Sequence, residues 1–181
     1  MPAPVIQTAA ASSRSKTDFS LPFVLDALVT QRVLTADQAQ NILTREPAAR
    51  ARVLKNQGVT GKDAARYEVS PVEIVAAFQV PLADGRGSLD EDRVTEIAAR
   101  AAGIVYKKVD PLKIDMALAT RTVSRPFAQK NVLLPLERVQ DGRLVVAVAN
   151  PFDQELFESI HVLTGMPIDP VLSSKDRKAH V

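Results

Sequence analysis

Two glycine-containing segments come closest to chemistry, because glycine-rich loops can bind nucleotide phosphates through their backbone amides. Gly61-Lys62 has the glycine–lysine order of such a loop, but Asp63 follows where a Mg²⁺-binding hydroxyl is needed. Gly58 is the one further glycine just before it. The other segment, 84–87 (DGRG), follows no predicted strand. We therefore predict a helix stop at the first segment and a turn at the second, and no phosphate site.

Acid–base and metal chemistry have equally little support. His161 and His180 are the two histidines, far apart in the chain, and there is no cysteine. Asp90-Glu91-Asp92 fits the first turn of a helix, where carboxylates favour the positive end of the dipole. Glu155 and Glu158 fit a solvated helix face. We predict no catalytic residue, no metal site and no bound cofactor.

Basic residues form the one candidate binding surface. Residues 41–66 contain six basic and two acidic side chains, a local charge of +4, whereas residues 126–172 contain three basic and six acidic, a local charge of −3. Arg45, Arg52 and Lys55 have the spacing i, i+7, i+10 and would share one face of a helix. They are either a solvated face or, as our candidate site, a contact surface for an acidic partner or another domain.

A helix-turn-helix reading of residues 62–75 predicts DNA binding, with 70–80 (SPVEIVAAFQV) as the second helix. A recognition helix must offer hydrogen-bond donors to bases and phosphates. This one has Glu73 as its single charge and Gln79 near its far end. Its apolar faces favour protein contacts, and we expect no nucleic-acid partner.

Composition predicts a water-soluble protein of one large or two small domains. The chain has 181 residues, of which 46% are hydrophobic and 4% aromatic, and 23 basic residues nearly balance 21 acidic ones. The longest apolar run, 144–149, has six residues and cannot span a bilayer. The N-terminus lacks the pattern of a secretory signal. Any membrane association would therefore come through a partner.

The first half reads as a series of capped helices. Residues 1–18 have no periodicity and are predicted to be a disordered tail. We predict helices at 22–30, 36–45, 48–57, 60–67, 71–79 and 89–102, with capping boxes opening at Thr35, Ser70 and Ser88. Two of these helix pairs, 22–45 and 71–102, form a weak internal repeat.

The second half alternates strands and helices. We predict a strand at 104–109, a helix from Asp110 to about Ala119 and a short helix at 124–130. A hairpin of strands 132–137 and 144–149 is closed by Asp141-Gly142 in a type I′ turn. Strand 144–149 is apolar throughout and should be central, covered on both faces. Helix 153–164 then leads to strand 168–172, which completes a βαβ unit.

These patterns together predict an α+β fold, with helical segments followed by a small α/β unit that has a mixed sheet. We expect a disordered tail at 1–18, a helical subdomain at 19–68 and a second helical segment at 69–103. The α/β subdomain would occupy 104–181. The end of the sequence looks cut, because Ser174 could cap a helix that has no length to develop.

The order of these elements and several local motifs resemble one known family. The motifs are 133–136 (LLPL), 141–148 (DGRLVVAV), 150–153 (NPFD), 163–165 (LTG) and 170–173 (PVLS). They are similar to the N-terminal domain of the bacterial type II secretion and type IV pilus assembly ATPases. The likeness covers 104–175 best, and the helices of 20–46 and 70–103 resemble the helical repeats that precede that domain.

The resemblance implies a non-catalytic docking and regulatory region, with the ATPase core of the same polypeptide following it. The partner implied is the cytoplasmic part of an inner-membrane platform protein, which would hold the chain in the cytoplasm at that membrane. One branch of the family binds cyclic di-GMP through motifs that open with Arg-Leu-Gly and carry a later glycine. Here 23–25 is Phe-Val-Leu, 70–72 is Ser-Pro-Val, and Arg32 replaces the later glycine. Cyclic di-GMP sensing stays as the alternative function.

Overall fold

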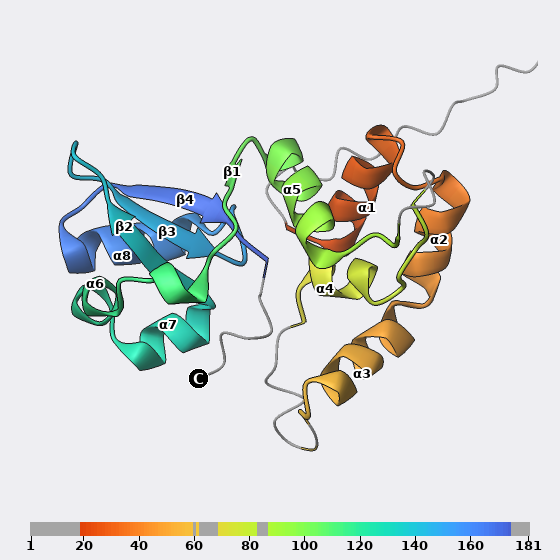
Figure 1. Cartoon of the computed structure of the whole chain (residues 1–181), viewed down its shortest axis with the longest axis horizontal. Helices are drawn as coiled ribbons and strands as arrows, with labels where there is room; N and C mark the ends of the chain where they lie inside the picture. Colours follow the sequence, from red (N-terminus) through yellow and green to blue (C-terminus); the bar gives the residue numbers. More distant parts are fainter. Residues whose placement is uncertain (1–18, 60, 62–68, 83–86, 175–181) are drawn as a thin grey trace, which may run out of the picture.

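The computed structural model describes residues 19–59, 61, 69–82 and 87–174. Figure 1 shows two lobes side by side, one of helices and one built on a sheet. The helical half contains α1 to α5, and the α/β half contains β1 to β4 with α6 to α8. The predicted α+β class, with a hairpin and a βαβ unit in a mixed sheet, is confirmed.

The first helices begin where their caps predict. Helix α1 spans Leu21–Thr30 after Ser20, and α2 spans Ala36–Thr44 behind a capping box in which Thr35 accepts the amide of Gln38 at 3.2 Å. Helix α3, Glu46–Asn56, begins two residues before the predicted start, because Pro47 lies in its first turn rather than at a helix end. The predicted helix at 60–67 lies almost wholly outside the described residues.

The second helical pair required one correction. Helix α4 spans Pro71–Ala76 behind the predicted capping box of Ser70 and Glu73. Helix α5 spans Glu91–Ala102, but its cap is Asp90, whose carboxylate accepts the amide of Arg93 at 2.8 Å. The prediction of Ser88 as the cap was wrong, because Ser88 is paired with Pro81 in a β-bridge.

Apolar residues from all five helices form one core. Helix α1 supplies Val24 and Leu28, which are fully buried, and α4 and α5 supply Val75 and Val94. Leu172 of the sheet belongs to the same core. The helical half is therefore packed directly against the α/β half.

The sheet has the strand order β1-β4-β3-β2. Strand β2, Leu133–Arg138, pairs antiparallel with β3, Leu144–Val148, and β3 pairs parallel with β4, Ile168–Leu172. Strand β1, Val105–Tyr106, is much shorter than predicted and pairs only with Val171 and Leu172 of β4. Pro170, the preceding residue of β4, has no amide hydrogen to extend that pairing.

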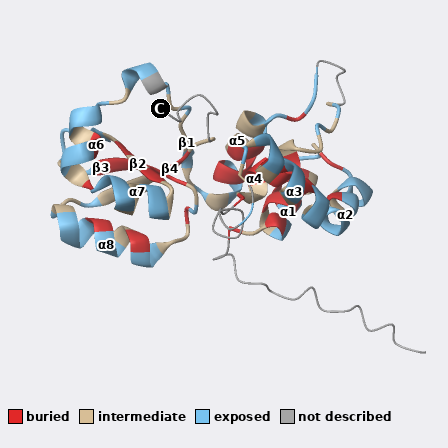
Figure 2. Cartoon of the chain, turned by 90° about the horizontal axis from the view of Figure 1, so that it is seen from below, coloured by how far each residue is buried: buried red, intermediate tan, exposed pale blue. Residues whose placement is uncertain are grey.

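Strand β3 is central and buried along its whole length, as predicted. On one face, α8 (Gln154–Thr164) contributes Leu156 and Ile160 to a core that includes Leu144 and Val146, and Figure 2 shows this helix on one side of the sheet. On the other face, Val145 and Ala147 pack with side chains of the sheet and with Val109.

The remaining helices of the α/β half differ from the prediction in one place. The single helix expected from Asp110 is two elements, because two aspartates each cap their own start. Asp110 caps a 3₁₀ turn at Pro111–Lys113, and Asp115 caps α6, Met116–Thr122. Helix α7, Arg125–Asn131, follows behind Ser124 as expected.

The hairpin turn is not of type I′. Gly142 has a φ of +86°, whereas Asp141 is not among the residues with positive φ. The amide of Gly142 donates to the carbonyl of Val139 at 2.9 Å, and Val139 and Arg143 are paired across the turn. This is a three-residue loop with glycine in the left-handed position. The guanidinium of Arg143 hydrogen-bonds the Asp141 carboxylate at 2.7 Å and lowers its pKa.

Candidate functional site

The three predicted binding residues lie on or beside α3 and are exposed. Arg52 and Lys55 are one turn apart in the helix, so their side chains are neighbours. Arg45 is the N-cap residue between α2 and α3, outside the helix. The guanidinium of Arg52 donates to the carbonyl of Ala77 at 3.4 Å. No ion pair joins any of the three to another described side chain. Their role in binding stays a prediction.

The second helix of the helix-turn-helix reading is not available to DNA. Four consecutive residues of α4, from Val72 to Val75, are buried. The carboxylate of Glu73 accepts hydrogen bonds from the side chain of Gln57 at 2.7 Å and from the amide of Ser70 at 2.8 Å. Because the helix faces the protein core, its side chains cannot reach base edges in a groove.

The positions that differ from the cyclic di-GMP pattern are occupied by packing residues. Leu25 is buried in the helical core, and the ring of Phe23 meets that of Phe152 edge-on at 5.5 Å between centroids. Arg32 adopts a φ of +57°, the backbone conformation that a glycine would hold most easily. Arg32 therefore has left-handed backbone at the position where the resemblance implies a glycine.

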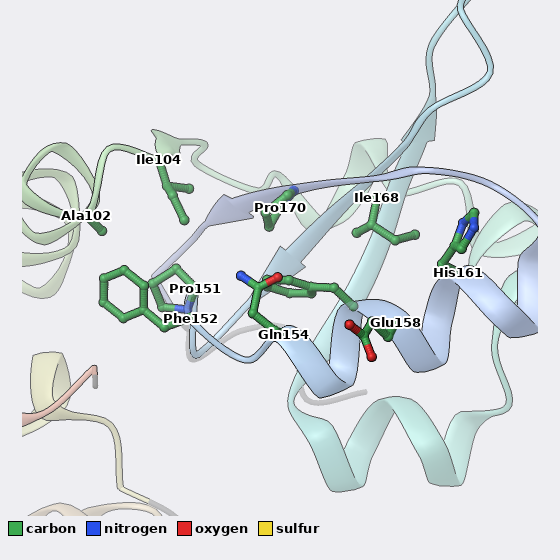
Figure 3. A pocket seen from close by; sticks show the side chains of 10 residues that line it. Ala102, Ile104, Pro151, Phe152, Gln154, Glu158, His161, Ile168 and Pro170 are labelled. Atoms are coloured by element: carbon green, nitrogen blue, oxygen red, sulfur yellow. The ribbon is translucent and has the colours of Figure 1, made fainter. Parts of the chain in front are cut away.

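A groove beside α8 is a concave feature of the described residues. We call it the α8 groove, and its volume is about 530 Å³. Figure 3 shows Ile168 and Pro170 on β4 facing the same space as Gln154, Glu158 and His161 on α8. Phe157 adds a further aromatic wall, and Ile104, Pro151 and Phe152 close the groove near the helical half. The walls are mainly apolar, and the rim is polar.

The polar rim lacks the arrangement of a catalytic centre. The Nδ1 atom of His161 lies 2.8 Å from the carbonyl oxygen of Met166, so the ring donates to the backbone. Among the described residues, no three His, Asp or Glu side chains lie together as metal ligands would. The groove is suited to holding an apolar segment by contact.

A polar cluster joins the two halves at the start of α5. Asp92 is bound both by the ammonium of Lys108 and by the hydroxyl of Ser174. Burial raises the pKa of Asp92, but the bonds from Lys108 and Ser174 outweigh it, so the pKa is lowered. The Tyr106 hydroxyl is buried beside them without a well-formed hydrogen bond to a described residue, and burial raises its pKa.

Aromatic contacts join the same two halves. Phe152 lies 6.5 Å from Phe19 and 5.5 Å from Phe23, measured between ring centroids. The sequence patterns did not predict that Phe152, Asp92 and Tyr106 join the two halves. Three of the six phenylalanines meet at this point. Because aromatic residues are scarce in the sequence, they were the one feature that could have indicated this contact.

Comparison with known proteins finds a family similarity in the second half of the chain. Residues 102–178 match the model of the MshEN domain. This match confirms the predicted resemblance, which was strongest at 104–175. No protein of curated function matches the sequence. The family match begins at the end of α5, so most of the helical half lies outside it.

Comparison with solved structures finds two that are similar to this chain. One is MshE with cdg, at 16% identity, covering 83% of this chain and 89% of that chain with a TM-score of 0.47. The other is the N-terminal domain of XpsE, at 18% identity, covering 85% and 87% with a TM-score of 0.47. Both the identities and the scores are low, so the assignment depends on the sequence match.

Proposed function

We propose that this chain, whose residues 102–178 match the MshEN domain, is the non-catalytic N-terminal docking region of a bacterial type II secretion or type IV pilus assembly ATPase. The family match is the observation that carries the proposal. The described residues offer packing surfaces and charged patches rather than converging acid–base groups. ATP hydrolysis would belong to an ATPase core elsewhere in the same polypeptide.

The partner in this proposal is the cytoplasmic part of an inner-membrane platform protein. No helix among the described residues has the length and apolarity needed to cross a bilayer. Attachment to the membrane would then be indirect, with the chain in the cytoplasm. Arg45, Arg52 and Lys55 are exposed and lack ion-pair partners among the described residues, which suits an acidic docking surface.

The test is capture of a platform protein from a detergent extract of inner membranes by the full chain. Recovery should fall sharply for the double variant Arg52→Glu/Lys55→Glu. The matched control is Arg121→Glu/Arg125→Glu, which reverses two exposed charges on the α/β half and should bind normally. Mass spectrometry must identify the captured protein as a secretion or pilus platform component. Equal recovery by both variants would exclude the α3 surface, and recovery of no platform protein would contradict the proposal.

Two competing functions make different predictions. A cyclic di-GMP sensor would release or absorb heat on titration with that nucleotide, and we expect none, because packing residues fill the ligand positions at 23–25. A DNA-binding module would retard DNA in a gel at low salt, where non-specific affinity is strongest. We expect no complex, because α4 is buried.

A further inference from the structure

The α8 groove is an apolar surface that the packing of the α/β half leaves open. It is lined by four half-buried apolar side chains, those of Ile104, Phe157, Ile168 and Pro170. Val162 follows Glu158 by one turn of α8 and has 81% of its surface exposed, so apolar surface continues past the rim of the groove. An exposed apolar surface with a polar rim is typical of a protein-binding site.

The edge of β4 beside the groove is poorly suited to pairing with an added strand. Strand β1 pairs only with Val171 and Leu172, so the described part of the chain places no strand beside the edge from Ile168 to Pro170. Pro170 has no amide hydrogen to donate, and proline on an edge strand opposes strand addition. An occupant of the groove must therefore be held by its side chains rather than by a ladder of main-chain hydrogen bonds.

The geometry of the groove suits one face of a helix. The α8 residues that line it have the spacing i, i+3, i+4, i+7 and extend over roughly 10 Å at the rise of an α-helix, namely Gln154, Phe157, Glu158 and His161. A helix that lies in a groove is anchored by apolar side chains with this same spacing. Its main-chain groups are bonded within the helix, so it needs no partner along the edge of β4.

The charge beside the groove is negative. Residues 126–172 contain three basic and six acidic side chains, a local charge of −3. Glu155 and Glu158 of α8 are exposed and form no ion pair with another described residue. The other four acids are engaged, Glu137 with Lys107, Asp141 and Asp169 with Arg143, and Asp153 with the amide of Leu156. Helix α8 contains no lysine or arginine, so its two open carboxylates complement a basic partner.

We propose that the α8 groove binds an amphipathic helix of another protein. Apolar side chains of that helix at i, i+3, i+4 and i+7 enter the groove, and lysine or arginine beside them faces Glu155 and Glu158. A second copy is a poorer fit, because its basic helix α3 buries Ala49 and Val53 in its own core. The inference is independent of the proposed function, because α3 and the groove lie on different halves of the molecule.

Titration of the ¹⁵N-labelled full chain with a synthetic helical peptide tests the proposal. The peptide has leucine at i, i+3, i+4 and i+7, lysine beside the leucines and alanine elsewhere. We expect amide shifts at Phe157, Glu158, His161 and Ile168 that saturate as peptide is added. A peptide with glutamate in place of lysine should bind at least about tenfold more weakly. Shifts that are absent, or that centre on another surface, would contradict the proposal.

A matched pair of variants tests the role of the two carboxylates. Glu155→Lys/Glu158→Lys should weaken binding of the lysine peptide by about tenfold and strengthen binding of the glutamate peptide. The control is Asp26→Lys/Asp37→Lys, which makes the same change of charge at two exposed residues of the helical half and should bind normally. Equal weakening in both variants would mean that only the net charge matters, and the proposal would be wrong.

Two further measurements separate the proposed occupant from its competitors. A lysine peptide with proline at its centre, which interrupts the helix, should bind much more weakly than the uninterrupted peptide. Equal binding would mean that the groove takes an extended segment, and the proposal would be wrong. Dilution of the protein alone should leave the amide signals of the groove unchanged. If those signals move on dilution, a second copy occupies the groove, which would also overturn the proposal.

Discussion

Glu73 is a carboxylate that is buried in the helical core, with 6% of its surface exposed. Its two oxygens accept hydrogen bonds from Gln57 and from the amide of Ser70, so it both closes the capping box of α4 and holds the end of α3. If a buried acceptor is lost, the donors that pointed at it have no partner. The resulting loss of folding free energy is larger than the loss from breaking a solvent-exposed hydrogen bond.

Replacement of Glu73 by Gln should therefore destabilise the protein by about 1–3 kcal/mol. The side-chain NH₂ group of the new glutamine would face one of the two donors, Gln57 or Ser70, and could not accept its hydrogen bond. The measurement is urea unfolding followed by circular dichroism. The matched control is Glu46→Gln, which breaks the half-exposed pair with Arg50 and should lower the free energy of unfolding by less than about 0.5 kcal/mol. An equal loss of unfolding free energy in the two variants would show that the burial of Glu73 does not add to the stability of its hydrogen bonds.

The stability contributed by Asp92 should depend on pH. Its pKa is lowered in the folded protein from the usual 3.8, so its contribution is complete above that value and is lost as the pH falls through the lower folded pKa. The difference in unfolding free energy between wild type and Asp92→Asn should be largest near neutrality and shrink below pH 3.8. In a Lys108→Gln background the change with pH should be smaller. A difference that is constant across this range would contradict the assignment.

Two non-glycine residues with left-handed backbone follow the first helix of each helix pair in the weak internal repeat. Arg32 after α1 has a φ of +57°, and Gln79 after α4 has a φ of +48°. Both side chains are exposed. The left-handed conformation costs a residue with a Cβ roughly 1–2 kcal/mol.

Arg32→Gly and Gln79→Gly should each stabilise the protein, by about 0.5–1 kcal/mol after the greater freedom of glycine in the unfolded chain is allowed for. Thermal unfolding of each variant measures this. The control is Gln31→Gly at the neighbouring cap position, where φ is −80°. At that position the backbone is not strained, so glycine should destabilise the protein by about 0.5–1 kcal/mol. Destabilisation by all three variants would mean that the backbone at Arg32 and Gln79 is not strained.

The elements that the sequence predicted best are those with local causes. Thr35 and Ser70 open α2 and α4 as predicted, and Gly103 and Gly165 end α5 and α8, because caps depend on a few neighbouring residues. Ser88 was misread because its pairing with Pro81 is a tertiary contact. The α8 groove was not predictable, since Ile104 and Phe157 come from distant parts of the chain and meet only through the strand order.

At the scale of the whole molecule, Leu172 is the residue through which the sheet enters the helical core. It lies on β4, has 1% of its surface exposed and belongs to the core cluster of α1, α4 and α5. The two halves therefore share buried apolar surface as well as the phenylalanine and Asp92 contacts.

Leu172→Ala should lower the free energy of unfolding by about 2–5 kcal/mol, and it should destabilise both halves together. Hydrogen exchange measures this directly, because protection should fall in α1 and in β3 to a similar extent. The control is Leu163→Ala, whose side chain is 63% exposed and whose removal should be close to neutral. Loss of protection confined to one half would show that the halves unfold independently.

The bond between Ser174 and Asp92 has a mechanical consequence. Ser174 is the last described residue after β4, and Asp92 lies in the first turn of α5, in the other half of the molecule. The polypeptide that continues past Ser174 therefore starts from a point fixed to the helical half, not only to the sheet. A displacement of the helical half would therefore also move this point.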